Sequence, residues 1–365
     1  MNSASPLLLI GIGTAGSSIA TGISRAFGDG LRHVLLDTDV VSGQSGAPFT
    51  LLGGERLSGR GAGGDVVTGR LAAEESIQAL DEHLEGVRIA VIVTALGGGT
   101  GGGATLEAAK HLSARGIPSV VFATLPFAFE GEDRQRNAAG VTSMIEDVAN
   151  ATFLIPLDKL IGDTDNMEAA LKRAIDTMAG GVTLFWRLVE KPGYIRLEAE
   201  RLRHLLAGAG RGRFATVTVQ GPGRASEAVD RLIRSELLTS SASPVRATLC
   251  GILAGNDLLL SEVGKIADGV RSAFGGLSFD LATVNDEQTF SGRLSVVVML
   301  FESNAKAEET PKGDEAPGGR RRKPRGPLAA GSGGRGRFKN AEPTIWNGED
   351  LDVPTFIRKN LNLDF

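Results

Sequence analysis

The segment 97–103 constrains the fold of this chain more than any other feature of the sequence. It reads Gly-Gly-Gly-Thr-Gly-Gly-Gly and lies between an apolar run (89–98), which predicts a strand, and a segment (105–114), which predicts a helix. Because glycine loses more conformational entropy on folding than other residues, so many glycines need a physical reason. A nest of backbone N–H groups around a phosphate chain is such a reason, and Thr100 adds a hydroxyl to it.

A second glycine turn follows the first apolar run of the chain. Gly11, Gly13 and Gly16 form the pattern GxGxxG between a predicted strand (7–13) and a predicted helix (14–27), and Asp37 ends the next apolar run. This spacing is typical of dinucleotide-binding folds, although it also occurs in tight turns that bind nothing. A dinucleotide fold needs no second glycine loop, and a P-loop is excluded because neither motif ends in Lys-Ser/Thr.

Apolar runs alternate with helical patterns along the first half of the chain. The runs at 7–13, 33–39, 89–98, 118–127 and 151–158 are apolar throughout, which predicts a parallel sheet covered by helices on both faces. A long helical pattern (166–188) follows. The remainder predicts a second, α+β domain with strands at 215–221, 247–255, 279–286 and 294–302, and helices at 196–206, 224–238 and 261–273.

The last sixty residues differ in composition from the rest. Residues 304–340 contain ten Lys and Arg against four Asp and Glu, a net charge of +6, with many Gly and Pro and few apolar residues. Such a segment cannot bury enough surface to fold alone, so a disordered basic linker is expected. The apolar residues after it predict a docking peptide that folds on a partner, or alternatively an element packed on the body. The run 320–323 is either solvated linker charge or a contact to anionic lipid or nucleic acid.

Composition excludes several classes of protein. The net charge of −4 is unlike that of a nucleic-acid-binding chain, and one cysteine, Cys250, allows neither an internal disulfide nor a zinc cluster. No apolar run reaches the roughly 18 residues of a membrane span, and no basic leader precedes the first apolar run. We therefore expect a cytoplasmic protein that contacts membrane only indirectly, through partners.

Several motifs together resemble the tubulin/FtsZ family. The GGGTGGG segment is similar to the family signature GGGTG[ST]G, and residues 59–63 resemble a glycine loop of the family. Four further segments are similar to family motifs and occur in the same order, over nearly the whole chain: LPFAFEGEDR (125–134), IPLDKL (155–160), AGNDLLLSEV (254–263) and LDVPTFIRK (351–359). The resemblance implies a Rossmann-like GTP-binding domain (1–165), a core helix (166–190), a second α+β domain (191–303), a linker (304–341) and a partner-binding peptide (342–365).

The resemblance also implies a site for GTP or GDP, with Mg²⁺ brought by the phosphates. Glu130 corresponds to a ribose contact, Arg134 to a phosphate contact, and Asp176 to the carboxylate that pairs with the guanine edge. Leu171 stands where the family has a phenylalanine over the base, so weaker stacking is expected. The phosphate loops correspond to Gly11, Gly13, Thr14, Ala15, Gly16, Ser17 and Ser18, to Gly61, Ala62 and Gly63, and to Gly97, Gly98, Gly99, Thr100 and Gly101.

The residues expected to promote hydrolysis depart from the family. In the family a neighbouring subunit inserts an NxDxxD loop against the bound GTP. Here Glu198 takes the place of the first aspartate, Arg201 replaces the second, and Glu200 is one position out of register. Loss of a water-orienting group lowers a rate by about 10²–10⁴-fold, so slow hydrolysis is expected. Arg201 is either a partner of the γ-phosphate or, with Glu198, Glu200 and Arg203, part of a surface ion-pair lattice.

The resemblance therefore predicts a GTPase that polymerises head-to-tail and organises the division ring. Its C-terminal peptide is expected to bind divisome adaptors or a membrane tether through Asp352, Pro354, Phe356, Ile357 and Arg358. One alternative is a non-hydrolysing paralogue that co-assembles with a catalytic relative. Another is a nicotinamide-dependent oxidoreductase built on residues 11–16 and Asp37, which leaves the segment 97–103 unexplained.

Overall fold

The chain forms two compact units, Met1–Thr310 and Pro311–Phe365. The computed structural model describes residues 5–27, 31–160, 166–190, 193–208, 210–239 and 243–302, and the backbone of 345–346 and 349–350. In the second unit, β11 (Ile345–Trp346) pairs with β12 (Glu349–Asp350) in antiparallel fashion. The predicted linker and the peptide residues Asp352, Pro354, Phe356, Ile357 and Arg358 lie outside the described residues.

A parallel sheet forms the first half of the larger unit, as predicted. Its strands are β1 (Leu7–Ile12), β2 (Arg32–Asp37), β3 (Phe49–Leu51), β4 (Ile89–Ala95), β5 (Ser119–Leu125) and β6 (Ala151–Pro156). They lie in the order β3-β2-β1-β4-β5-β6. The direction of winding reverses between β1 and β4, and ligands of such sheets bind at the carboxyl ends of the strands beside this point.

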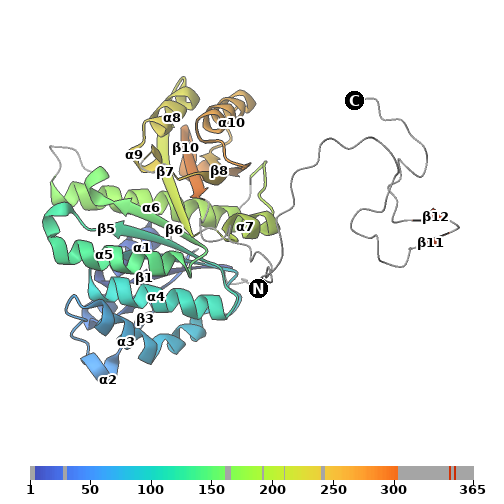
Figure 1. Ribbon diagram of the computed structural model, residues 1–365. Coiled ribbons are helices and arrows are strands. Elements are labelled where there is room, and N and C mark those ends of the chain that lie inside the picture. The colour runs from blue at the N-terminus through green and yellow to red at the C-terminus, as the bar shows by residue number, and fades with distance from the viewer. Residues whose placement is uncertain are drawn as a thin grey trace, which may run out of the picture. The chain divides into compact units, whose positions relative to one another are not determined.

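Helices cover both faces of this half, so its strands are mostly buried, whereas the three residues of the edge strand β3 are partly exposed. On one face lie α1 (Gly13–Phe27) and α6 (Met167–Glu190), whose apolar residues join one core cluster. On the other lie α3 (Val66–Ser76), α4 (Gly99–Ala114) and α5 (Glu132–Glu146), which share a second cluster (Figure 1). Short helices connect these elements: η2 (Val40–Ser45), α2 (Gly54–Leu57), η3 (Ile77–His83), η4 (Ala128–Glu130) and η5 (Leu157–Lys159).

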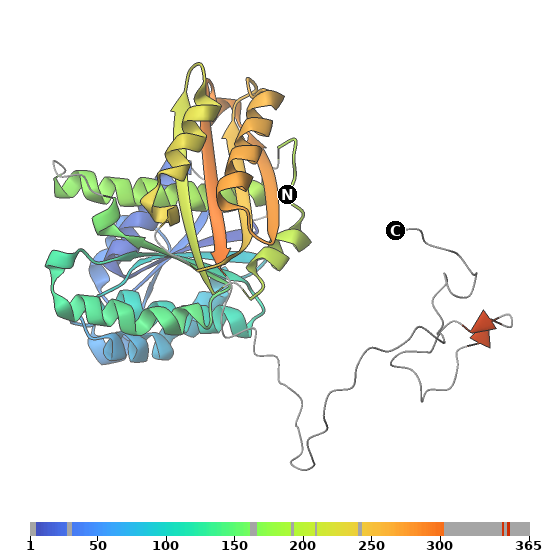
Figure 2. The ribbon, with the colours of Figure 1, turned by 45° about the horizontal axis from the view of Figure 1, so that its top comes forward.

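The second half continues the same sheet instead of forming a separate one. Its strands β7 (Arg211–Gln220), β10 (Arg293–Glu302), β8 (Val245–Ala254) and β9 (Ser278–Asn285) extend the order beyond β6 to give ten strands. The strand β10 is antiparallel to both its neighbours. Helices α8 (Arg224–Ile233) and α10 (Leu260–Phe274) cover one face (Figure 2), while α6 and α7 (Ala199–Leu206) pack on the other. The short helices α9 (Glu236–Thr239) and α11 (Glu287–Phe290) complete this half.

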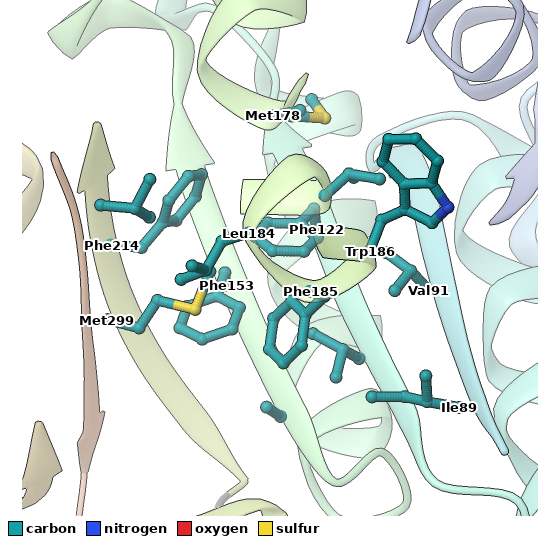
Figure 3. Packing of buried hydrophobic residues seen from close by; sticks show 14 of the residues in the cluster. Ile89, Val91, Phe122, Phe153, Met178, Leu184, Phe185, Trp186, Phe214 and Met299 are labelled. Carbon is teal, nitrogen blue, oxygen red and sulfur yellow. The ribbon is translucent and has the colours of Figure 1, made fainter. Parts of the chain in front are cut away.

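The junction between the halves is held mainly by side chains. Among the described residues, two pairs join β6 to β7, namely Thr152↔Arg211 and Phe153↔Gly212. Buried phenylalanine rings from both halves meet there around α6 (Figure 3). The ring of Phe122 lies 5.1 Å from that of Phe153 and 4.9 Å from that of Phe214. Because the halves share one sheet and one core, the boundaries predicted at residues 165 and 190 stay predictions.

The helix α4 begins earlier than predicted. It starts at Gly99 and not at residue 105, so most of the GGGTGGG segment is helical. A Cβ atom on Gly103 would lie 2.8 Å from the carbonyl carbon of Gly69 and closer still to two other backbone atoms of α3. A Cβ atom on Gly101 would collide with the carbonyl oxygen of Ala95. These two glycines therefore serve close backbone packing, which is a different reason from the phosphate nest expected for the whole segment.

Candidate functional site

The two glycine turns meet at the point where the winding of the sheet reverses. Strands β1 and β4 are parallel neighbours, and their carboxyl ends lead into α1 and α4. Gly13 has a φ of +73°, and a Cβ atom there would lie 3.3 Å from the backbone nitrogen of Gly101. The hydroxyl of Thr94 lies 3.2 Å from the carbonyl oxygens of both Ile12 and Gly101 and ties the turns together. The predicted proximity of residues 11–18 and 97–103 is confirmed.

The point where the two glycine turns meet is suited to binding an anion. The helix α4 is preceded by Gly98, which offers no side-chain cap, so its first-turn N–H groups rely on other partners. The helix α1 starts at Gly13, directly after β1, and exposes Thr14 and Ala15 in its first turn. Both helix dipoles place partial positive charge at the same end of the sheet. Two such N-termini side by side are suited to a phosphate chain.

Hydroxyl groups surround the meeting point, and a buried carboxylate anchors them. The hydroxyls of Thr38 and Thr100 lie 2.6 Å apart. Asp37 accepts hydrogen bonds from the hydroxyls of Thr14 at 3.0 Å and Ser42 at 2.5 Å, and from the backbone N–H of Thr38 at 2.8 Å. Its side chain is almost fully buried, and this burial raises the pKa of the Asp37 carboxyl. Asp37 therefore makes internal bonds, whereas the dinucleotide hypothesis needs it to face a ribose.

The glycine loop 61–64 lies beside the second turn. The backbone N–H of Gly61 donates to the carbonyl oxygen of Thr38 at 3.0 Å. The side-chain amide of Asn137 on α5 donates to the carbonyl oxygens of Gly64 at 3.0 Å and Gly97 at 3.3 Å. The predicted loop of Gly61, Ala62 and Gly63 thus joins the site. Asn137 was not identified from the sequence, because a lone helical asparagine gives no local signal of such a role.

An apolar cavity of about 440 Å³ opens next to the first turn. Its volume lies in the range of ligand pockets. Glu130 and Arg134 contribute its polar part, and their side chains bond to each other at 2.6 Å. The second carboxylate oxygen of Glu130 accepts the backbone N–H of Phe127 at 2.9 Å. The cavity is lined by Ala15, Ser18, Ile19, Ala95, Leu96, Thr124, Pro126, Phe127, Phe129, Glu130, Arg134, Leu157, Leu171, Ala174 and Ile175.

The structure brings one of the two predicted base contacts into this cavity. Leu171 lines it, and its side chain is about half exposed. Asp176 lines a neighbouring hollow of about 400 Å³ instead. Its carboxylate lies 2.9 Å from the ammonium group of Lys172, one turn earlier on α6. A contact between Asp176 and a base in the cavity therefore requires this carboxylate to turn away from Lys172.

The predicted hydrolysis residues lie on and before α7, and none of them lines the cavity. Glu198 is exposed and makes no side-chain cap to α7. Glu200 pairs with Arg203, and lies 3.8 Å from His204. The guanidinium of Arg201 donates to both carboxylate oxygens of Asp280 on β9, at 2.6 and 2.8 Å, which raises the Arg201 pKa. Arg201 is thus engaged within its own chain, with a partner that neither hypothesis named.

Among the residues that the structure describes, no group of three or more His, Cys, Asp or Glu side chains is arranged to hold a metal ion. Within the same residues, no helix combines the length and the apolar character needed to cross a membrane.

Comparison with known proteins gives consistent matches. A family profile described as "Tubulin/FtsZ family, GTPase domain" matches residues 6–165. The cell division protein FtsZ of Pseudomonas aeruginosa is 32% identical over 274 residues, covering 72% of this chain and 69% of that protein. FtsZ of Coxiella burnetii is 32% identical over 308 residues, covering 81% of this chain and 79% of that protein.

Solved structures show the same fold. An FtsZ dimer from M. jannaschii has a TM-score of 0.75 at 24% identity and covers 82% of this chain and 89% of its own. CetZ2 from Haloferax volcanii, in a GTPγS-bound protofilament, has a TM-score of 0.69 at 24% identity and covers 83% of this chain and 95% of its own. Together with the converging glycine turns, these matches support a cytoskeletal GTP-binding protein. The chain belongs to the tubulin/FtsZ family.

Proposed function

We propose that the protein binds GTP and GDP at the two glycine turns, polymerises head-to-tail, and organises the division ring in the cytoplasm. The observation that carries the proposal is the convergence of the α1 and α4 N-termini beside an apolar cavity. The turns provide N–H groups for the phosphates, and the cavity is large enough for a ribose and a base.

The individual residues then have distinct roles in nucleotide binding. The first-turn N–H groups of α1 and α4 bind phosphate oxygens, and Thr100 adds a hydroxyl. Arg134 lines the cavity with its guanidinium more than half exposed, so it is available to an anion. Mg²⁺ would neutralise phosphate charge and would be held mainly by the phosphates themselves, and the hydroxyls of Thr38 and Thr100 could contribute to holding it.

We assign the preference for guanine over adenine to Asp176. Its carboxylate can accept two hydrogen bonds from the guanine edge, which adenine cannot donate. Because this role requires the Lys172 contact to open, Asp176→Ala is expected to reduce the preference for GTP over ATP without abolishing nucleotide binding. Competition binding with the two nucleotides measures this ratio, and an unchanged ratio would remove Asp176 from the site.

Hydrolysis is proposed to need a second copy of the chain. The cavity and Glu198 lie on different parts of the protein, so one copy does not complete a hydrolytic site by itself. Related proteins are known as an FtsZ dimer and a CetZ2 protofilament, which supports self-association here. Because only Glu198 keeps the position of an activating acid, turnover is expected to be slow, by about 10²–10⁴-fold. Full loss of turnover would instead indicate the non-hydrolysing paralogue.

The decisive experiment is the GTPase rate as a function of protein concentration, combined with GTP-dependent pelleting. A site formed between subunits predicts a threshold concentration, and Glu198→Ala should lose turnover while still pelleting with GTP. Asp268→Ala is a matched control, because Asp268 is an exposed acid on α10 far along the sequence. A rate that is linear in protein and indifferent to Glu198 would refute the interface mechanism.

The C-terminal peptide is proposed to bind divisome adaptors or a membrane tether, so that membrane contact is indirect. A chain ending at residue 341 should polymerise like the full chain but fail to be recruited to vesicles that carry an adaptor. Equal recruitment of both chains would contradict this role.

A further inference from the structure

Phe129 is an exposed aromatic residue on the wall of the cavity. Its side chain is 68% exposed, although the cavity around it is apolar. Of the large hydrophobic side chains exposed in the described part of the chain, Phe129 and Leu171 are the two that line this cavity. An exposed ring is unfavourable in water, and exposed apolar surface inside a pocket indicates a ligand that covers it.

The ring of Phe129 is held in a fixed orientation. It stacks on the ring of Phe127 with centroids 4.8 Å apart and an interplanar angle of 11°, and Phe127 itself is buried. The turn η4 that carries Phe129 is held at its N-terminal end by two hydrogen bonds. Its backbone N–H at Ala128 donates to Asp158 at 3.1 Å, and the side-chain amide of Gln135 donates to the carbonyl oxygen of Phe127 at 3.0 Å. A ring fixed before binding loses little entropy when a ligand covers it.

Much of the remaining cavity lining is aliphatic. Leu171 and Ile175 of α6 and Ile19 of α1 belong to it. A purine base presents two flat apolar faces, and aromatic rings of proteins bind such a face by stacking. Leu171 has no π-system, so it can cover a base but cannot stack with it. Within the cavity lining, Phe129 and the more deeply buried Phe127 are the aromatic side chains, and Phe127 already has one face covered by Phe129.

We infer that Phe129 is the aromatic platform on which the base of the bound guanine nucleotide stacks, with Phe127 supporting it and Leu171 closing the other side. This inference rests on the proposed function, because it needs the phosphates at the glycine turns and the base in the apolar cavity. Stacking accepts any base, so Phe129 contributes affinity, whereas discrimination between guanine and adenine belongs to hydrogen-bonding groups.

Nucleotide binding to the full chain tests this inference. Phe129→Ala is expected to weaken GTP and GDP about tenfold, since loss of a stacking ring typically reduces base affinity by this order. Phe129→Trp keeps a platform and should retain the affinity within about threefold. Met144→Ala is the matched control, because Met144 is an exposed apolar residue on α5 that does not line the cavity.

Inorganic tripolyphosphate separates base binding from phosphate binding. It has no base, so it should bind the wild type and the Phe129→Ala variant equally. The fluorescence that Phe129→Trp adds to that of the native Trp186 and Trp346, measured against the wild type, should also be quenched by GDP and not by tripolyphosphate. Unfolding curves without nucleotide check that each variant is folded.

Results that refute the stacking role of Phe129 can be distinguished from results that refute the proposed function. Equal GDP affinity of the wild type and Phe129→Ala overturns the stacking role, and so does an equal loss of tripolyphosphate binding, which would indicate damage to the turn. Reduced pelleting with unchanged GDP affinity would show that a second copy covers Phe129. A wild type that binds tripolyphosphate but no GDP or GTP would refute the proposed function itself and this inference with it.

Discussion

Replacing Gly103 by alanine is expected to destabilise the fold without removing any proposed nucleotide contact. Gly103 lies inside α4, two residues beyond the turn that faces the phosphates, and its Cα faces the backbone of α3. An added Cβ atom would lie 2.8 Å from the carbonyl carbon of Gly69, and nearer to the backbone nitrogen of Arg70 and the carbonyl oxygen of Val66. Since real Cβ atoms essentially never approach another heavy atom within 3.0 Å and the two nearest atoms lie at 2.4 Å, this contact must open by at least about 0.6 Å.

The magnitude follows from two opposing effects. Forcing an extra methyl group into a closely packed contact destabilises a protein by about 1–3 kcal/mol. Alanine also favours a helix over glycine by about 0.8–1 kcal/mol. Gly140→Ala on α5 isolates the second effect, the helix preference, because Gly140 is helical and exposed, with no atom within 4 Å of an added Cβ. Both variants gain the same helix preference, so the difference between them equals the steric term, about 1–3 kcal/mol.

Urea denaturation of the nucleotide-free protein measures this difference. We expect a lower midpoint for Gly103→Ala than for Gly140→Ala, with a similar dependence of the unfolding free energy on urea, so that the midpoints can be compared directly. If Gly103→Ala were as stable as Gly140→Ala, the steric explanation of the helical glycines would be refuted. The presence of glycine at these helical positions would then need the phosphate explanation alone.

Two other predictions concern buried and paired charges. Burial raises the pKa of the Asp37 carboxyl, so the stabilisation it gives is fully present below its unfolded pKa and is lost as the pH rises through its higher folded pKa. Asp37→Asn should therefore gain stability relative to the wild type as the pH rises from about 4 to about 7 in thermal unfolding, and a constant difference would contradict this. For the pair of Arg201 and Asp280, a double-mutant cycle with alanine should give a coupling of about 0.5–1 kcal/mol. A loss of GTP turnover in Arg201→Ala but not in Asp280→Ala would instead indicate that the arginine acts on the nucleotide.

The regular elements were predictable because the hydrophobic pattern is strong. The run 7–13 and the pattern 166–188 correspond closely to β1 and α6, since fully apolar strands and long amphipathic helices give clear periodicity. The three-residue strand β3 was not predicted, because so short an edge strand has no pattern of its own. The continuity of the sheet was also not predicted. It depends on two residue pairs between β6 and β7, and no local sequence signal reports a contact between such distant segments.

The parts of the site that lie within a single sequence motif were predictable. The two glycine turns could be assigned to one phosphate site because each is a recognisable motif of the tubulin/FtsZ family. The inward orientation of Asp37 was not predictable, because it depends on the hydroxyls of Thr14 and Ser42 from two other elements. The partner of Arg201 was missed for the same reason, since Asp280 lies 79 residues away in sequence. The role of Phe129 was not predictable, because its exposure and its stacking on Phe127 depend on the folded structure.

The narrow ladder between β6 and β7 has a consequence for the temperature response of the protein. With two residue pairs joining these strands, the halves are held together chiefly by apolar packing of rings such as Phe122, Phe153 and Phe214. Attraction between apolar groups weakens as water is cooled, whereas hydrogen-bonded ladders such as that between β7 and β10 do not depend on it in the same way. Chilling should therefore loosen the junction before it affects either half, and hydrogen exchange near 0 °C would report faster exchange there first.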